Sequence, residues 1–221
     1  MNNQIEHTLT SRCRVLLLGD DAWHPAANVQ RGFNAQVDTP FAFQFSTDGR
    51  QWSSEQLKDY SVVVIAKANH LCAANQSPWL TADTQGAFRE FVRDGGGLFL
   101  IHGGTCYQDL PEMRSVTGGA FLRHPDQCSV SIEPALAHPL TVGVSPFVIT
   151  DEHYFMALDA KDADVFLEAR SAHGVQPAGW TRREGDGRVC VLTPGHNVEV
   201  WLHPEFQKLL RNSLTWIAKL N

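Results

Sequence analysis

The segment that most constrains the fold is Gly95–Gly104, in which glycines flank a short apolar run. The run Leu98–Ile101 follows an amphipathic pattern and is too short for a helix, so it predicts a central β-strand that a helix precedes. The strand leads directly into His102. Because ligands bind outside the carboxyl ends of strands in open α/β sheets, we expect His102 to lie at a functional edge. We also expect Gly103 and Gly104, which lack side chains, to leave room for a ligand near the backbone.

Three further apolar runs have the same character as the central one. Arg14–Gly19, Ser61–Ala66 and Arg188–Leu192 are continuous, as expected of strands that are covered on both faces. A helix with Asn28 as its N-cap is predicted after the first run, and a second helix is predicted to end at Arg93. This alternation predicts an α/β fold, with a mostly parallel sheet and helices on both faces.

The middle of the chain is less regular, and irregular strands are expected there. Ser129–Ile132 alternates polar and apolar residues, which predicts an exposed or edge strand. Asp164–Glu168 and Gln176–Trp180 are further strand candidates. A closing helix is predicted from Pro204, because proline is favoured at the first helical position and apolar residues follow it at helical spacing.

Composition limits the class of protein. A chain of 221 residues with 43% hydrophobic content can bury a core, and it shows no linker, so we expect a single domain over residues 1–221. Its 18 basic and 24 acidic residues give a net charge of −6 and no basic cluster, which argues against a nucleic-acid partner. Met1–His7 has no export signal and no apolar stretch could cross a bilayer, so we expect a cytoplasmic protein without a membrane partner.

The five cysteines are odd in number and form no C-x-x-C pair, so free thiols are expected. Cys106 follows the glycine-rich turn and could act as a nucleophile if His102 removed its proton. A nucleophile elbow, however, needs serine or cysteine at the tight turn, where this chain has His102. We therefore rank nucleophilic catalysis below acid/base catalysis.

Histidines follow three of the predicted strands. His24 comes after the first strand, His102 after the central strand and His196 after the last, while Glu152 and Tyr154 lie in an intervening segment. Imidazole titrates near neutral pH and a nearby carboxylate can orient it, so this convergence predicts general acid/base chemistry. The alternative is that each histidine only caps a turn or satisfies a buried backbone group.

Metal binding is a second alternative, because the chain has ten histidines. No H-E-x-x-H or paired C-x-x-C spacing supports it, so no cofactor and no metal ligand is predicted, and a divalent metal is kept as the alternative. The triplet His203-Pro204-Glu205 is similar to the His-x-Glu pair of class I glutamine amidotransferases. Ordinary helix-start roles explain it equally well.

Several ordered motifs resemble those of the ThuA-like (trehalose utilisation) family. They are the segments 95–102, 118–125, 138–141, 151–154 and 187–196. The resemblance implies a class I glutamine amidotransferase-like, flavodoxin-like fold that lacks the amidotransferase cysteine, and a role in bacterial carbohydrate metabolism. It does not fix a reaction. This sequence departs from the family pattern at His153, inside the Asp-Glu-x-Tyr motif, and at Pro194.

The family's polar positions fall on residues of the strand-end cluster. We assign His102, Glu152 and His196 as catalytic candidates. The substrate-binding candidates are His24, Gly103, Gly104, His124, Tyr154 and Trp180, the last because an aromatic face can stack on a sugar.

These observations predict a protein that binds a small sugar-derived molecule and acts on it through His/Glu acid/base chemistry. The alternative is a non-catalytic sugar-binding or assembly module, in which Phe41–Phe45 could pair subunits of a homo-oligomer. Glutamine amidotransferase activity is not expected, because the elbow cysteine is missing.

Overall fold

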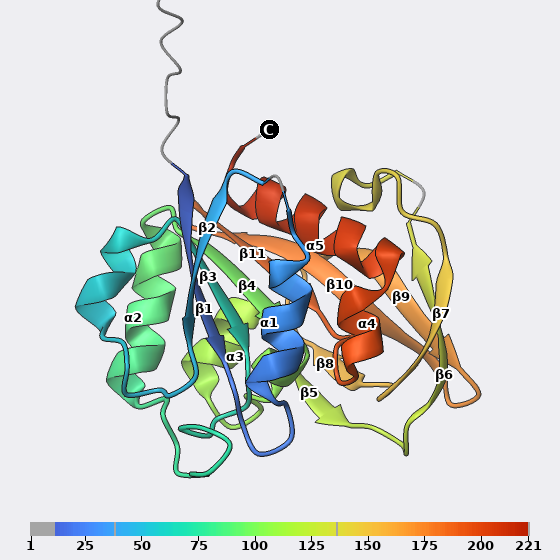
Figure 1. Ribbon diagram of the computed structural model, residues 1–221, viewed down its shortest axis with the longest axis horizontal. Coiled ribbons are helices and arrows are strands. Elements are labelled where there is room, and N and C mark those ends of the chain that lie inside the picture. Colours follow the sequence, from blue (N-terminus) through green and yellow to red (C-terminus); the bar gives the residue numbers. More distant parts are fainter. Residues whose placement is uncertain (1–11, 38, 136, 221) are drawn as a thin grey trace, which may run out of the picture.

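The protein is built around one nine-stranded sheet with helices on both faces (Figure 1). The structure, a computed structural model, describes residues 12–37, 39–135 and 137–220. The expectation about an export signal rests on Met1–His7, which lies outside the described residues. Within the described part of the chain, no helix is long and apolar enough to cross a membrane.

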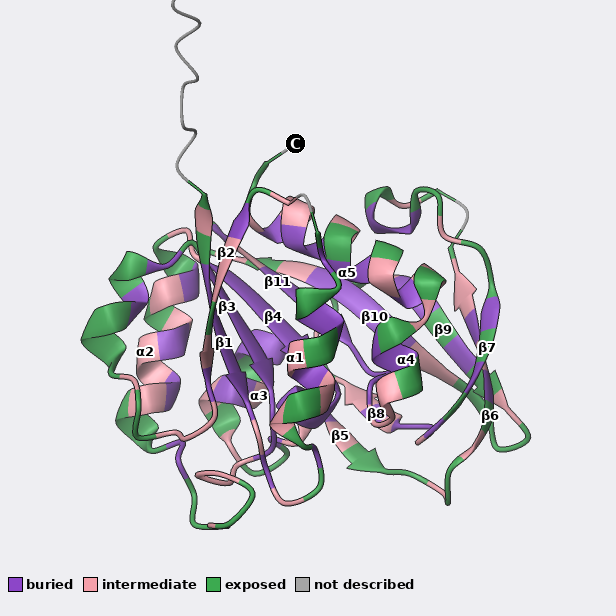
Figure 2. Cartoon of the chain, in the orientation of Figure 1, coloured by how far each residue is buried: buried purple, intermediate pink, exposed green. Residues whose placement is uncertain are grey.

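Five neighbouring strands of the sheet are parallel. In spatial order they are β2 (Phe41–Ser46), β1 (Cys13–Gly19), β3 (Val62–Ala66), β4 (Gly97–Ile101) and β11 (Gly187–Leu192). All residues of β3 and β4 are buried, which explains their uninterrupted apolar sequences (Figure 2). The predicted strands at 14–19, 61–66, 98–101 and 188–192 are confirmed to within a residue at each end.

The remaining four strands of the sheet are antiparallel. They are β10 (Gly174–Glu184), β9 (Asp164–Ser171), β6 (Cys128–Pro134) and β7 (Phe147–Asp151), in that order from β11. The predicted edge position of 129–132 is wrong, because β6 lies between β9 and β7. A separate pair, β5 (Gly119–Arg123) and β8 (Phe155–Leu158), was not predicted.

Two groups of helices cover the two faces of the parallel strands. One group is α1 (Ala26–Asn34), α4 (Val198–Leu202) and α5 (Pro204–Ile217), and the other is α2 (Ala82–Arg93) and α3 (Pro111–Thr117). Figure 1 shows α1, α4 and α5 in front of the sheet. Short 3-10 helices are η1 (Ser54–Asp59), η2 (His102–Thr105) and η3 (Pro139–Thr141). Successive strand residues point into opposite cores, as the period of a strand requires.

The first residues of α1 and α5 test two predictions made from the sequence. Asn28 does not cap α1, because the helix begins at Ala26, whose N–H donates to Asp20 Oδ1 at 3.1 Å. At the other end of the chain, α5 begins at Pro204 as predicted. There His203 Nδ1 accepts a hydrogen bond from Glu205 N at 3.2 Å, so the triplet has a helix-start role.

The sequence suggested that Phe41–Phe45, which form most of β2, could be an exposed surface that pairs subunits. Phe41 is buried, and Phe43 and Phe45 are half-buried and pack against the core. The phenylalanines therefore stabilise this edge of the sheet and do not form an exposed apolar patch. Together the parallel core and the helices on both faces make an α/β flavodoxin-like fold.

Candidate functional site

Three histidines meet at the carboxyl ends of parallel strands. β1 carries the chain from the upper to the lower edge of the sheet in Figure 1, and β4 and β11 run parallel to it within the same sheet. The ring centroids of His24 and His102 lie 4.8 Å apart, those of His24 and His196 5.5 Å, and those of His102 and His196 5.6 Å. The structure thus brings together the histidines that follow three separate strands.

His102 takes the position of the elbow residue. Its φ of 47° lies in the left-handed region, which costs a residue with a side chain free energy and persists only where the surroundings hold it. Its Nδ1 lies 2.7 Å from the carbonyl oxygen of Thr193. Since a carbonyl only accepts hydrogen bonds, Nδ1 carries a proton, and in the neutral imidazole Nε2 presents a lone pair. That Nε2 is buried and makes no hydrogen bond among the described residues.

His24 is oriented by a carboxylate that the sequence did not single out. Asp21 Oδ2 lies 2.7 Å from His24 Nδ1 and also accepts a hydrogen bond from Ala68 N at 2.6 Å. Burial opposes ionisation of Asp21, but His24 and these backbone donors outweigh it and lower the pKa of Asp21 to about 2. Burial lowers the pKa of His24. A neutral His24 therefore donates from Nδ1 and leaves Nε2 free.

Asp151 and Glu152, at the end of β7, complete the cluster. Asp151 accepts hydrogen bonds from Gly195 N at 2.8 Å and from His196 N at 3.1 Å, and so fixes the loop that carries His196. Glu152 Oε2 lies 3.3 Å from His102 Nε2 and 3.2 Å from His196 Nδ1. Neither imidazole nitrogen is placed for a well-formed hydrogen bond.

Electrostatics differ between these two carboxyl groups. Burial raises the pKa of Asp151. Burial acts in the same direction on Glu152, but its interactions with His102 and His196 outweigh burial and hold the pKa of Glu152 well below its usual value. Glu152 in turn raises the pKa of His196. Glu152 is therefore the anion around which the imidazoles gather.

Donor atoms of His24, His102, Glu152 and His196 all lie within 4.8 Å of one another. This is the one group of its kind in the described ranges that could share a metal ion. Exposure of the side chains rises from 1% for His102 and 8% for His24 to 12% for Glu152 and 21% for His196. The cluster is therefore reached from the side of Glu152 and His196.

Two predicted substrate-binding residues lie at the margin of this cluster. His124 is the more accessible: its side chain is 36% exposed and its Nε2 lies 3.6 Å from Glu152 Oε1. Tyr154 is buried and stacks on His102 with a centroid separation of 4.1 Å. Tyr154 supports the imidazole from within the protein, so direct contact with a substrate, as predicted, does not fit its burial.

The predicted roles of two glycines need correction. A Cβ at Gly103 would lie 2.6 Å from His24 Nδ1, and a Cβ at Gly104 would lie 2.0 Å from the carbonyl oxygen of Ile65. Gly103 packs closely against His24 and Gly104 packs closely against β3. The space that was predicted for a ligand is therefore filled by the protein.

The predicted contact of Trp180 with a sugar also does not fit the position of this residue in the structure. It is 0% exposed, and its Nε1 donates to the carbonyl oxygen of Thr117 at 2.9 Å. It is therefore a core residue and cannot stack on a sugar. His153, at the variable position of its motif, is likewise buried and pairs with Ser171 Oγ at 2.6 Å, away from the cluster.

Cys106 is a poor nucleophile. Burial of its sulfur raises the pKa of the Cys106 thiol to about 12, and Sγ lies 3.9 Å from the Tyr154 hydroxyl. The thiol is protonated at neutral pH. All five cysteines are free, as predicted.

The spaces near the cluster differ in size. The hollow between His24, His102 and His196 encloses at most about 200 Å³, whereas small-molecule pockets usually measure about 300–1,000 Å³. A cavity of about 300 Å³ lies beside Cys106, Tyr107 and Phe121. A sugar could therefore lie over the rim of the cluster but not among its rings.

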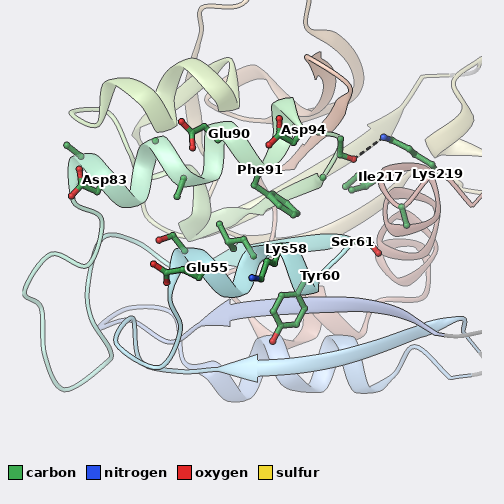
Figure 3. Close-up of a pocket in the computed structure, with 18 residues that line it drawn as sticks. Glu55, Lys58, Tyr60, Ser61, Asp83, Glu90, Phe91, Asp94, Ile217 and Lys219 are labelled. Atoms are coloured by element: carbon green, nitrogen blue, oxygen red, sulfur yellow. Dashed lines mark hydrogen bonds between the residues drawn. The ribbon is translucent and has the colours of Figure 1, made fainter.

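A larger cavity of about 1040 Å³ lies at the opposite, amino ends of β3 and β4 (Figure 3). Charged side chains such as Lys58, Glu90 and Asp94 line it. Among the described residues, no ion pair joins the charged side chains that line this cavity. Among the described residues, no group of potential metal ligands converges in this cavity.

Solved structures share this fold. A ThuA-like protein from Bacteroides uniformis is similar with a TM-score of 0.73 and 22% identity, covering 93% of this chain and 91% of that one. A ThuA-like protein from Parabacteroides merdae gives a TM-score of 0.75 and 17% identity, covering 95% and 91%. A cold-adapted β-galactosidase from Rahnella sp. R3 gives 0.66 and 15%, covering 95% of this chain and 32% of the enzyme.

No curated protein matches the sequence significantly. The model of the ThuA family, described as trehalose utilisation, matches residues 15–217, which include every residue of the cluster. The chain therefore belongs to the ThuA family, and its membership suggests a role in trehalose utilisation.

Proposed function

We propose that this protein binds a small, polyhydroxylated, sugar-derived molecule at the carboxyl edge of its parallel strands and converts it by acid/base chemistry. The observation that carries the proposal is the convergence of His24, His102, Glu152 and His196, whose donor atoms lie within 4.8 Å of one another. Clusters at a strand edge that include groups with shifted pKa values, here His24, Glu152 and His196, are typical of catalytic sites.

The roles follow from exposure and charge. His196 is the most exposed of the four side chains, and Glu152 raises its pKa, so His196 is the proton donor. Glu152 orients it. His102, which Tyr154 supports from behind, presents a lone pair toward the same carboxylate and is the candidate proton acceptor.

The substrate would lie over the rim of the cluster. His124 flanks Glu152 there, and its ring packs against Phe121 with a centroid separation of 5.8 Å. Phe121 also lines the adjacent cavity of about 300 Å³. An apolar ring beside exposed imidazoles suits a molecule with both C–H faces and hydroxyl groups.

Family membership supports a substrate from carbohydrate metabolism, because the family is described by trehalose utilisation. A cytoplasmic location is part of the proposal, and a structural neighbour from Salmonella typhimurium is a cytoplasmic protein. A non-catalytic binding or assembly module is the second candidate. It is favoured by the β-galactosidase from Rahnella, where the matched region is 32% of a longer chain.

The test combines a binding screen with two variants. Oxidised and phosphorylated sugars are screened for an increase in melting temperature, since a ligand that binds the folded state stabilises it. Turnover of the compounds found is then measured for wild type, His102→Ala, His196→Ala and the control His173→Gln, which changes an exposed histidine outside the cluster. Unchanged turnover in both alanine variants would contradict the catalytic assignment. Binding without turnover in the wild type would favour the module.

A further inference from the structure

We infer that His24, His102, His196 and Glu152 form a binding site for one divalent transition-metal ion. The inference deepens the proposed function, because it assigns a shared ligand to the same four side chains. It does not depend on the identity of the sugar, and it can be tested without one.

Hydrogen bonds behind the rings aim lone pairs into the cluster. The Thr193 carbonyl holds the proton of His102 on Nδ1, and Asp21 does the same for His24. Each imidazole therefore presents an unprotonated Nε2. Histidines that bind metals are typically held in this way, with the other ring nitrogen donating to a carboxylate or a carbonyl.

Two nitrogens that face the cluster have no hydrogen-bond partner. His102 Nε2 and His196 Nδ1 are both buried and unsatisfied among the described residues. A buried polar atom without a partner costs about 1–3 kcal/mol. Two of them beside one carboxylate oxygen indicate that the structure provides for a ligand between them.

The distances between donors fit a small ion. Two ligands bound at about 2.0–2.1 Å in a tetrahedral arrangement lie about 3.3 Å apart. Glu152 Oε2 lies 3.3 Å from His102 Nε2 and 3.2 Å from His196 Nδ1. No separation within the group of four exceeds 4.8 Å, so a contraction of about 1.5 Å at most would complete a tetrahedron.

The charge around the cluster favours a cation. Asp21, Asp151 and Glu152 lie beside or within it, and no lysine or arginine among the described residues forms an ion pair with any of them. The hollow between the rings, at most about 200 Å³, suits an ion better than an organic ligand.

The donor set indicates which ions fit. Three imidazoles and one carboxylate suit Zn²⁺ and its first-row neighbours, whereas Mg²⁺ and Ca²⁺ prefer oxygen ligands. Such an ion would have to take a hydroxyl or carbonyl oxygen of the substrate as a fifth ligand in order to act on it as a Lewis acid. With His102 and His196 engaged as ligands, His124 becomes the accessible imidazole for proton transfer, 3.6 Å from Glu152.

Metal binding is measured on the full-length protein after chelation and dialysis. The protein is titrated separately with Zn²⁺, Mn²⁺, Fe²⁺, Co²⁺ and Ni²⁺, bound metal is counted by elemental analysis, and the melting temperature is followed in parallel. The variants are Glu152→Gln, which keeps the shape of the side chain, His102→Ala, and the control His173→Gln. The absorption spectrum of the Co²⁺-loaded wild type reports the nitrogen and oxygen ligands directly, whether or not a variant folds.

The expected result is one Zn²⁺ per chain in the wild type and in His173→Gln, with a higher melting temperature. In Glu152→Gln we expect at least a tenfold weaker affinity. Wild type that takes up no stoichiometric Zn²⁺, Mn²⁺, Fe²⁺, Co²⁺ or Ni²⁺ overturns the inference, as does full binding in Glu152→Gln. Sugar turnover by a protein that takes up none of these ions would overturn the metal site while leaving the proposed function in place. Stoichiometric metal without turnover of any sugar would do the reverse.

Discussion

The two ends of the parallel strands carry opposite kinds of surface. At the carboxyl ends, His24, His102, His196 and Glu152 converge in a hollow of at most about 200 Å³. At the amino ends, a cavity of about 1040 Å³ is lined by charged side chains, and among the described residues these form no ion pairs with one another (Figure 3). The converging donor atoms therefore lie at the smaller of the two spaces. The volume of a cavity is a poor guide to where such donors gather.

Backbone geometry explains part of this difference. His102 and Gly195 both have positive φ, so two adjacent strands turn sharply at their carboxyl ends and bring their following residues together. At the amino ends the chain enters the strands through η1 and the end of α2. Those entries leave side chains such as Glu90 directed to solvent, where they interact weakly.

The largest expected effect is that of removing the charge of Glu152. Glu152→Gln cannot hold His196 protonated and is a weaker ligand, so we expect turnover of the identified sugar to fall by about 100-fold or more. The matched variant Glu90→Gln changes a carboxylate that lines the other cavity and should leave kcat/KM unchanged. Steady-state kinetics on both variants tests whether function is confined to the carboxyl end. Equal losses in the two variants would refute the contrast.

Two glycine-to-alanine substitutions, one at each end of the parallel strands, compare how tightly the two regions are packed. Gly103→Ala would place a Cβ 2.6 Å from His24 Nδ1, so we expect it to displace His24 from Asp21 and to destabilise the protein by about 2 kcal/mol. Gly86→Ala, in α2 beside the large cavity, meets no atom within 4 Å. It should stabilise the protein by about 0.5–1 kcal/mol, because alanine favours a helix. Urea denaturation measures both. A stable Gly103→Ala protein with unchanged ligand binding would show that His24 tolerates displacement.

A smaller change in stability is expected for Trp180, where a substitution tests whether this residue belongs to the core or contacts the sugar. Trp180→Phe removes the hydrogen bond to the Thr117 carbonyl and should cost about 1 kcal/mol more than Trp52→Phe, since Trp52 Nε1 has no partner among the described residues. Sugar affinity should be the same in both variants. Loss of affinity in Trp180→Phe alone, measured by calorimetry, would restore the stacking role that burial argues against.

The parallel core could be predicted because its strands are buried on both faces. β1, β3, β4 and β11 are short apolar runs, and the histidine after each of three of them marks the carboxyl edge. The antiparallel strands are harder, because β6 and β7 alternate buried and more exposed residues and β10 contains a register shift near Pro177. Their mixed sequences predict strands but not their ends or neighbours.

The sequence predicted the histidines and Glu152 of the candidate site, but not the residues that orient them. Glu152 follows β7, the strand at the far edge of the sheet order, and the sequence grouped it with the histidines although no strand pattern placed it beside them. Asp21, Asp151 and the Thr193 carbonyl orient the cluster through hydrogen bonds. In the sequence, Asp21 and Thr193 are ordinary loop residues, and Asp151 stands out only as the first residue of the Asp-Glu-x-Tyr motif. A signal existed for Asp21, which lies three residues before His24, but the same spacing is common in turns.

The smallest expected effect concerns Cys106, which borders the 300 Å³ cavity at the carboxyl end. A thiol whose pKa is about 12 is protonated at neutral pH, so Cys106→Ser should change turnover by less than about twofold. Iodoacetamide should accordingly label Cys106 in the native protein far more slowly than in the urea-unfolded protein, as read by mass spectrometry. Rapid labelling of Cys106 together with loss of turnover in Cys106→Ser would move the chemistry from the imidazoles to the thiol. It would leave the contrast between the two ends intact but replace acid/base catalysis by the imidazoles with nucleophilic catalysis by the thiol.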